Sequence, residues 1–195
     1  MDNDQATAIL RSKIEVTASI ADRLAYSINK AQQLELDPIA MDKLKTISDD
    51  EMETVAAFLF RYGSLVSNIQ DAIFKSIGDV EQEPIKEMSN RDKTNLMERI
   101  GVLPSAEEFS SLAIIRNKLM HDYPEEMQKH LDRINTIIKD APRLVEIFIG
   151  IAKYAEKFSI KMSFDGLKHL RGFIRDDNAN DAPNSFSSPS SRLLG

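Results

Sequence analysis

Cysteine is absent from the 195 residues of this sequence. The chain therefore has no disulfide framework, no thiolate metal site and no cysteine nucleophile. Its apolar runs are far shorter than the ~20 residues that cross a bilayer. The first ten residues, MDNDQATAIL, also lack the basic and apolar regions of a signal peptide. These features predict a cytoplasmic protein that has no membrane partner.

Excess positive charge is also missing, because the net charge is −6. An acidic chain does not coat nucleic acid through a broad basic surface, although a few cations in a cleft would suffice to hold a phosphate. Glycine and proline are scarce, with seven of each. No strand followed by a glycine-rich turn and a helix appears, which excludes dinucleotide-binding and phosphate-loop folds.

Apolar residues at helical spacing are abundant. Hydrophobic residues make up 42% of the chain, enough for one sizeable core. Spacing, caps and breakers predict helices over residues 5–36, 50–77, 90–101, 105–123 and 124–157, the last kinked at Pro142. The residues expected on the apolar faces of the first two helices include Ile9, Ile14, Ile20, Leu24, Ile28, Met52, Val55, Phe58, Tyr62, Ile69, Ile73 and Ile77. The predicted fold class is all-α, an up-and-down helical bundle.

The C-terminal residues differ in composition from the bundle. Residues 1–157 form the predicted helical domain, and residues 158–175 an extension packed on or beside it. A brief alternation of apolar residues from Phe158 to Phe164 fits either a short strand or an irregular helix. Residues 176–195, rich in Asp, Asn, Ser and Pro, are predicted to be a disordered tail.

The stretch IIRNKLMHDYP, residues 114–124, carries the chemistry of the chain. Leu112, Arg116 and Leu119 share one helical face, so Arg116 is expected on an inward stripe where a cation must be paired or face a wet cavity. His121 lies about 140° around the helix from Arg116. Pro124 should end the helix, and in that fraying turn His121 could swing back.

Each polar residue of this stretch also has a structural explanation. Arg116 could pair with a carboxylate or extend its charge to water, His121 could cap helix carbonyls, and Asn117 could bond to the backbone. Together they favour RNA hydrolysis through the 2′-hydroxyl. Histidine can move a proton near neutral pH, and arginine can hold the pentacovalent phosphate. One His and one Arg per chain is sparse, but two copies across a two-fold axis would supply a full set.

The segment RNKLMHDY resembles the R-x4-H-x-Y motif of the HEPN-domain ribonuclease toxins, specifically the HepT-like group. The preceding AAFLFRYGSLVSNIQDAI and MERIGVLPSAEEFSSLAIIRNKLMHDY are similar to the family's run of helices into the motif. The resemblance implies a HEPN-like helical bundle that forms a homodimer. It also implies a metal-independent endoribonuclease with Arg116 and His121 as catalytic residues and Asn117 supporting the site.

The same resemblance implies a type VII toxin–antitoxin pair. The partners would be an RNA substrate, with tRNA and mRNA as candidates, and a MntA-like nucleotidyltransferase antitoxin. Tyr123 would then receive AMP groups that place charge and bulk beside the site. No cofactor is implied, and the three histidines, His121, His130 and His169, have no metal-ligand spacing.

Two alternatives use the same helices. In the first, the chain is a non-catalytic HEPN module that binds nucleotide or substrate as the partner of a nucleotidyltransferase, with Arg116 clamping a phosphate. In the second, it is a helical interaction domain whose apolar stripe is a dimer seam and whose Arg116 pairs with a glutamate.

Overall fold

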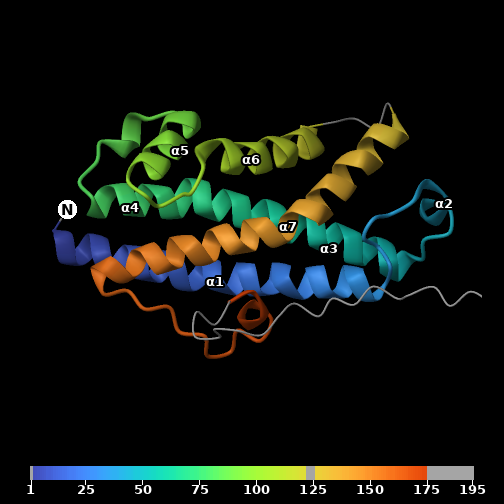
Figure 1. The fold of residues 1–195 in the computed structure, drawn as a ribbon, viewed down its shortest axis with the longest axis horizontal. Coiled ribbons are helices and arrows are strands. Elements are labelled where there is room, and N and C mark those ends of the chain that lie inside the picture. The colour runs from blue at the N-terminus through green and yellow to red at the C-terminus, as the bar shows by residue number, and fades with distance from the viewer. Residues whose placement is uncertain (1, 122–125, 175–195) are drawn as a thin grey trace, which may run out of the picture.

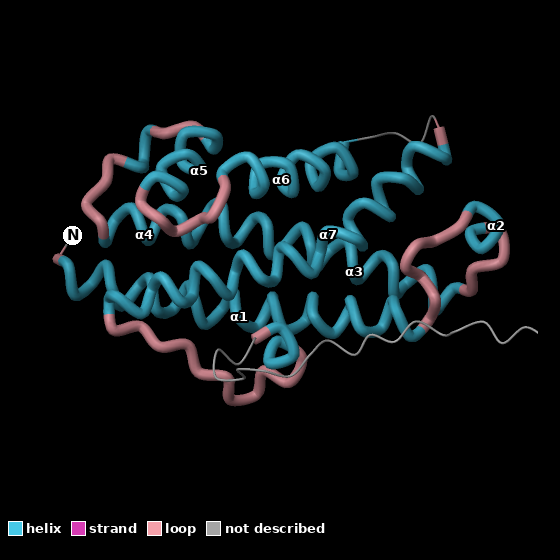
Figure 2. Tube along the Cα trace, in the orientation of Figure 1, coloured by secondary structure: helices cyan, strands magenta, loops and turns pink. Residues whose placement is uncertain are grey.

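The structure is a computed structural model that describes residues 2–121 and 126–174, with residues 119–121 described by their backbone only. Within those ranges the chain forms α-helices, short 3₁₀ turns and one π-helical turn, and no strand (Figure 2). The all-α fold class predicted from the sequence is therefore confirmed for the described residues. The strand considered for residues 158–164 does not form: Phe158 ends a 3₁₀ turn, Glu156–Phe158, and residues 159–164 are irregular.

Helix α1 spans Asn3–Gln33, and one side of it is buried along its whole length. Leu10, Ile14 and Leu24 are almost fully buried, whereas Ile9 is 37% exposed. The buried face of α1 therefore includes Leu10 in place of the predicted Ile9. The helix ends before the predicted residue 36. Glu35 has a positive φ and the amide of Leu36 donates to the carbonyl of Ala31, which closes the helix upstream of Pro38.

The second long helix is divided into three parts. After the one-turn helix α2 (Met41–Leu44), α3 spans Asp49–Ser67, a π-helical turn η1 spans Asn68–Ile73, and α4 spans Phe74–Val80. A capping box starts α3, because the Ser48 hydroxyl accepts from the amide of Glu51 while the Glu51 carboxylate accepts from the amide of Ser48. The predicted position of Met52 on the apolar face is wrong, since it is 44% exposed.

The π-helical turn was not predicted, although the apolar spacing contains its signal. Ile69, Ile73 and Ile77 follow one another at intervals of four, and all three are fully buried. In a regular α-helix of 3.6 residues per turn, repeated intervals of four drift around the axis. A turn with i to i+5 bonding takes up the extra residue and keeps the side chains on one face.

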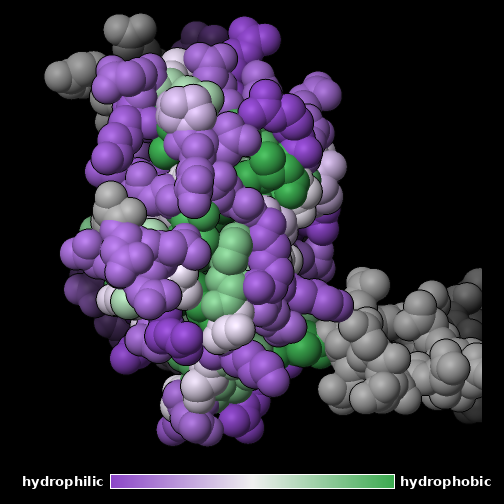
Figure 3. Space-filling view, turned by 90° about the vertical axis from the view of Figure 1, so that its left-hand side faces the viewer, coloured by the Kyte–Doolittle hydropathy of each residue, from purple (hydrophilic) through white to green (hydrophobic). Residues whose placement is uncertain are grey.

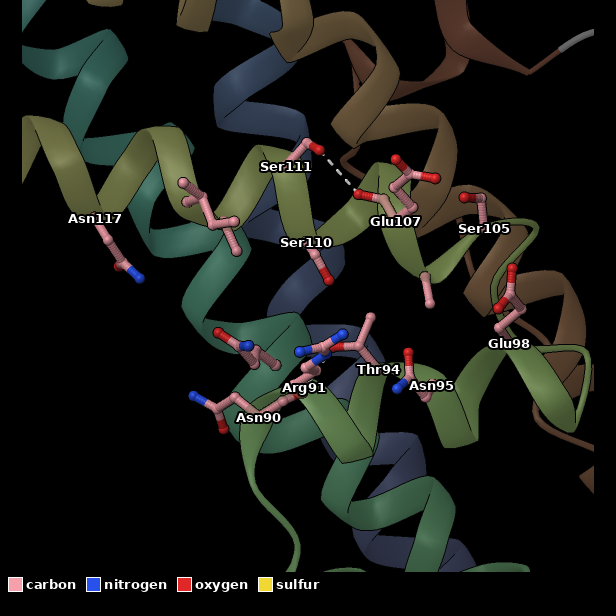
Figure 4. A pocket seen from close by; sticks show the side chains of 14 residues that line it. Asn90, Arg91, Thr94, Asn95, Glu98, Ser105, Glu107, Ser110, Ser111 and Asn117 are labelled. Carbon is pink, nitrogen blue, oxygen red and sulfur yellow. Dashed lines mark hydrogen bonds between the residues drawn. The ribbon is translucent and has the colours of Figure 1, made fainter.

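Helices α5 (Asn90–Arg99) and α6 (Ala106–His121) lie on the side of α3–α4 away from α1 (Figure 1). Ser89 caps α5 by accepting from the amide of Asp92. The helix ends at Arg99, two residues before the predicted end, and Gly101 follows at φ 80°. Ser105 caps α6 by accepting from the amide of Glu108. The two helices run in opposite directions and enclose a groove between them (Figure 4).

Helix α7 (Met127–Ala155) returns across the bundle and packs on α1, α3 and α6. Its buried residues form one face that includes Leu131, Ile134, Ile138, Leu144, Phe148 and Ile151. Pro142 lies inside this helix, which continues past it to Ala155. The predicted helix start at Pro124 lies outside the described residues.

Residues 159–174, here called the C-terminal segment, run back along α1 (Figure 1). Ile160 and Leu170 are buried against the core. The Asp22 carboxylate on α1 accepts hydrogen bonds from the backbone amides of His169 and Leu170 at 2.7 and 2.9 Å. The ring of His169 meets the ring of Tyr26 edge-on at 5.1 Å. A buried carboxylate thus fixes the segment to the bundle. The predicted tail, residues 176–195, lies outside the described residues.

The end of the bundle where α1 begins is mostly hydrophilic in its described part, with apolar side chains visible in a narrow band (Figure 3). One large apolar side chain, that of Phe60 in the middle of α3, is 76% exposed. None of the helices in residues 2–121 or 126–174 combines the length and the apolar character needed to cross a bilayer.

Candidate functional site

Arg116 lies where α6 meets α3. Its side chain passes over Gly63, at which a Cβ would be 3.7 Å from both Cγ and Nε of Arg116. One turn further along α3, the Ser67 hydroxyl accepts a hydrogen bond from Nη2. On α6 itself, Oδ1 of Asn117 accepts from Nη1 at 2.7 Å. The guanidinium therefore bridges the two helices through two neutral partners.

The charge of Arg116 is not neutralised by a carboxylate among the described residues. Its side chain is half-buried. A cation that is bonded only to a hydroxyl and an amide keeps its full charge available to an anion, and its planar fork of donors fits phosphate oxygens. The pairing with a glutamate that an interaction domain would have used is not seen in this part of the chain.

Two contacts fix α6 so that Arg116 is held in place. The hydroxyl of the buried Tyr62 of α3 donates a hydrogen bond of 3.2 Å to the carbonyl of Leu112, one turn before Arg116. Burial raises the pKa of Tyr62, and the charge of Asp140 adds to this effect, so the hydroxyl stays protonated and able to donate.

The start of α6 is tied to α7 by an ion pair. Arg143 donates from Nε and Nη2 to the two carboxylate oxygens of Glu108, at 2.6 and 2.9 Å. These bonds lower the pKa of Glu108 although partial burial opposes the shift. The Glu108 carboxylate thus joins α6 to α7, while the backbone amide of Glu108 donates to the capping hydroxyl of Ser105.

His121 is the last residue of α6, and its side chain lies outside the described residues, as does all of Tyr123. The sequence suggested that a frayed turn would let His121 swing toward Arg116. The backbone of α6 remains helical through position 121. Positions 116 and 121 are therefore about 140° apart around one helix axis and do not share a face.

A groove of about 860 Å³ lies between α5 and α6, with Gln70 of η1 also in its lining. Asn117 belongs to this lining as well, so the groove begins at the residue that holds Arg116. Figure 4 shows Ser110 and Asn117 of α6 pointing toward α5, where Arg91 and Asn95 point back. The volume falls within the range of about 300–1,000 Å³ seen for small-ligand sites.

No family model, curated protein or solved structure matches this chain. A proposal for its function therefore rests on two features of the described residues. The first is an arginine at the contact of α3 and α6 without a carboxylate partner, and the second is the polar groove beside it.

Two features of the site could not be read from the RNKLMHDY motif. Ser67, which holds one end of the guanidinium, lies 49 positions earlier in the sequence. Its signal was present as a set of small or polar residues, Gly63, Ser64, Ser67 and Asn68, where α3 ends and η1 begins. The groove has no sequence motif, because α5 and α6 contribute isolated polar positions that only the packing brings together.

Proposed function

We propose that this protein is a HEPN-like, HepT-like endoribonuclease that cleaves RNA without a metal ion. The observation that carries the proposal is the guanidinium of Arg116, which is fixed by Ser67 and Asn117 and has no carboxylate partner among the described residues. An arginine held in this way by neutral groups supports the binding of a phosphodiester. The groove that starts at Asn117 offers room for the RNA on one side of it.

The proposed reaction breaks the bond between phosphorus and the 5′-oxygen of the next nucleotide. The 2′-oxygen attacks phosphorus and loses its proton, and the 5′-oxygen leaves and gains one. The products are a 2′,3′-cyclic phosphate and a 5′-hydroxyl. Arg116 stabilises the charge on the pentacovalent phosphate. His121 carries out one of the two proton transfers, a role worth ~10²–10⁴-fold in rate.

A homodimer completes this site. Positions 116 and 121 lie on different faces of α6, which supports a site in which the two residues come from different chains. A second copy related by a two-fold axis would supply the missing group, as isologous dimers place the same residues on both sides of an interface. Each active site would then combine Arg116 of one copy with His121 of the other.

The surface around Phe60 supports an interface beside Arg116. Phe60 is 76% exposed on α3 and borders a groove of about 610 Å³ between α1 and α3. It lies one turn before Gly63 and Ser64, close to where the Arg116 side chain crosses α3. A large aromatic side chain left in water is typical of an interaction surface.

Phe60→Asp tests the interface by sedimentation. The expected result is a monomer that does not cleave RNA, with unchanged helicity. Met52→Asp is the matched control, because Met52 is an exposed apolar residue of the same helix outside the groove. A Phe60→Asp variant that stays dimeric and active would show that the copies meet elsewhere.

A MntA-like nucleotidyltransferase is the proposed antitoxin, and both partners would act in the cytoplasm. In this reaction the phenol oxygen of Tyr123 attacks the α-phosphorus of ATP, pyrophosphate leaves, and the phenol proton is lost. The added AMP would place negative charge near Arg116 and hinder RNA binding. Intact mass after co-expression should show added AMP on the protein and none on Tyr123→Phe; an unmodified chain would refute this part.

The enzyme itself is tested with purified protein and RNA in EDTA. Arg116→Ala and His121→Ala should each abolish cleavage and leave the thermal unfolding midpoint near that of the unchanged protein. Arg99→Ala is the control, since Arg99 is exposed at the end of α5 and its side-chain contact with the described residues is a surface ion pair with Glu83. Cleavage that survives both site substitutions would reject the assignment. Tight nucleotide binding without cleavage would instead favour a non-catalytic binding partner of a nucleotidyltransferase.

A further inference from the structure

The groove between α5 and α6 is rich in side chains that can form hydrogen bonds and have none. Gln70, Asn90 and Asn95 carry carboxamides, and Ser110 a hydroxyl, that make no hydrogen bond within the described residues. Asn117 uses its Oδ1 for Arg116, and its Nδ2 donates to no group in residues 2–121 or 126–174. A carboxamide presents a donor and an acceptor in one plane, which is the arrangement that reads the edge of a nucleobase.

The groove is polarised along its length. Asn117 and Asn90 lie at one end of the groove, Arg91 lies nearer its middle across from Ser110, and Glu98 and Glu107 lie toward the opposite end (Figure 4). The first of these ends adjoins Arg116, which is bonded to Asn117. The three charged residues of the lining sum to −1. A groove that followed the phosphate backbone would need several cations instead. Its charge therefore suits one phosphate near Arg91 and a neutral, hydrogen-bonding group beyond it.

The acidic end selects among bases. The carboxylates of Glu98 and Glu107 have no ion-pair or hydrogen-bond partner among the described residues and can only accept hydrogen bonds when ionised. Adenine, cytosine and guanine carry an exocyclic amino group that donates, whereas uracil carries none. A base with an amino group would donate to this end of the groove. Uracil could donate only from its N3–H, which lies between two carbonyl oxygens that an ionised carboxylate repels.

We infer that the groove between α5 and α6 is a nucleobase subsite for the RNA nucleotide next to the cleaved phosphate, and that it discriminates against uracil. This inference rests on the proposed ribonuclease function for its place in catalysis. Arg91 can hold the adjoining phosphate or lay its guanidinium plane against the base. The carboxamides of Gln70 and Asn95, together with Ser110, read the base edge.

Nuclear magnetic resonance titration with the four ribonucleosides tests the subsite directly, because nucleosides contain no phosphate. Adenosine, cytidine and guanosine should shift the signals of the groove residues, and uridine should bind about tenfold more weakly. Asn95→Ala and Glu98→Ala should each weaken binding of the preferred nucleoside about tenfold. Asn29→Ala is the control, since Asn29 is exposed on α1, away from the groove. Equal binding of all four nucleosides, or no effect of Asn95→Ala, would overturn the subsite.

Sequencing the ends of cleaved RNA separates this inference from the proposed function. Uracil should be depleted at one position beside the cut, and Glu98→Ala should remove that depletion from the cleavage that this variant retains. Cleavage with the same base preference in the unchanged protein and in Glu98→Ala would reject the groove as an RNA subsite. Absence of cleavage by the unchanged protein would reject the ribonuclease, and the nucleoside titration would then decide the groove alone.

Discussion

Replacing three glycines by alanine, one at a time, tests the packing that positions α4 and α6. Each glycine lies inside a helix, where alanine is about 0.8–1 kcal/mol more favourable than glycine. At Gly150 an added Cβ has no neighbour within 4 Å, so the free energy of unfolding should rise by this full amount. At Gly63 the Cβ would meet Arg116 at 3.7 Å, which is ordinary contact, so most of the gain should remain.

Gly78 differs from both because an added Cβ would lie 2.6 Å from Cγ2 of the fully buried Ile85. Overpacking of this kind costs about 1–3 kcal/mol, so the substitution should give a net loss of up to about 2 kcal/mol. For a chain of this size, 1 kcal/mol corresponds to about 2–4 °C in the thermal midpoint. Thermal unfolding followed by circular dichroism should show a rise for Gly150→Ala and Gly63→Ala and a fall for Gly78→Ala.

An equal rise for all three would mean that α4 does not pack on Ile85 as described. A lower thermal midpoint for Gly63→Ala would mean that the Arg116 side chain lies closer than 3.7 Å to the position of a Cβ at residue 63. The proposed ribonuclease activity should be the same in Gly63→Ala as in the unchanged protein, because the added methyl group would touch the Arg116 side chain without displacing it.

Two further predictions concern single carboxylates. Hydrogen bonds from Lys43 and Ser48 lower the pKa of Glu51 from 4.5 to about 2. Its stabilisation is therefore complete above about pH 4.5 and is lost as the pH falls toward 2, so Glu51→Gln should flatten the loss of stability on acidification in that window; an unchanged pH profile would contradict this. Asp22→Ala leaves two backbone amides of the C-terminal segment without their acceptor and should cost about 1–3 kcal/mol, with faster proteolysis after residue 158. Asp165→Ala, in an exposed part of the same segment, should have little effect, and equal protease resistance of the two variants would refute the role of Asp22.

The main helices could be predicted because their signals are local. Three–four spacing of apolar residues, the Ser48 cap and Gly101 after α5 each depend on neighbours within one or two turns of the same helix. The errors occurred where tertiary packing decides. Ile9 and Met52 fit the spacing but are 37% and 44% exposed, because the described part of the chain does not bury these positions.

The candidate site could be predicted only in part, for the same reason. The motif singles out Arg116 and Asn117, and the structure brings these two side chains together. The motif could not reveal Ser67 or the groove, since these depend on how α3, α5 and α6 meet. The anchoring of residues 169 and 170 by Asp22 is equally non-local, because the partners are 147 and 148 positions apart.

The chemistry of the RNA ends tests the central claim most directly. A defined RNA is incubated in EDTA with the unchanged protein and with Arg116→Ala, and the new ends are identified by mass spectrometry. Cleavage through the 2′-hydroxyl predicts 2′,3′-cyclic phosphate and 5′-hydroxyl ends with the unchanged protein and none with Arg116→Ala. Intact RNA, or 3′-hydroxyl and 5′-phosphate ends that depend on an added metal ion, would contradict the account.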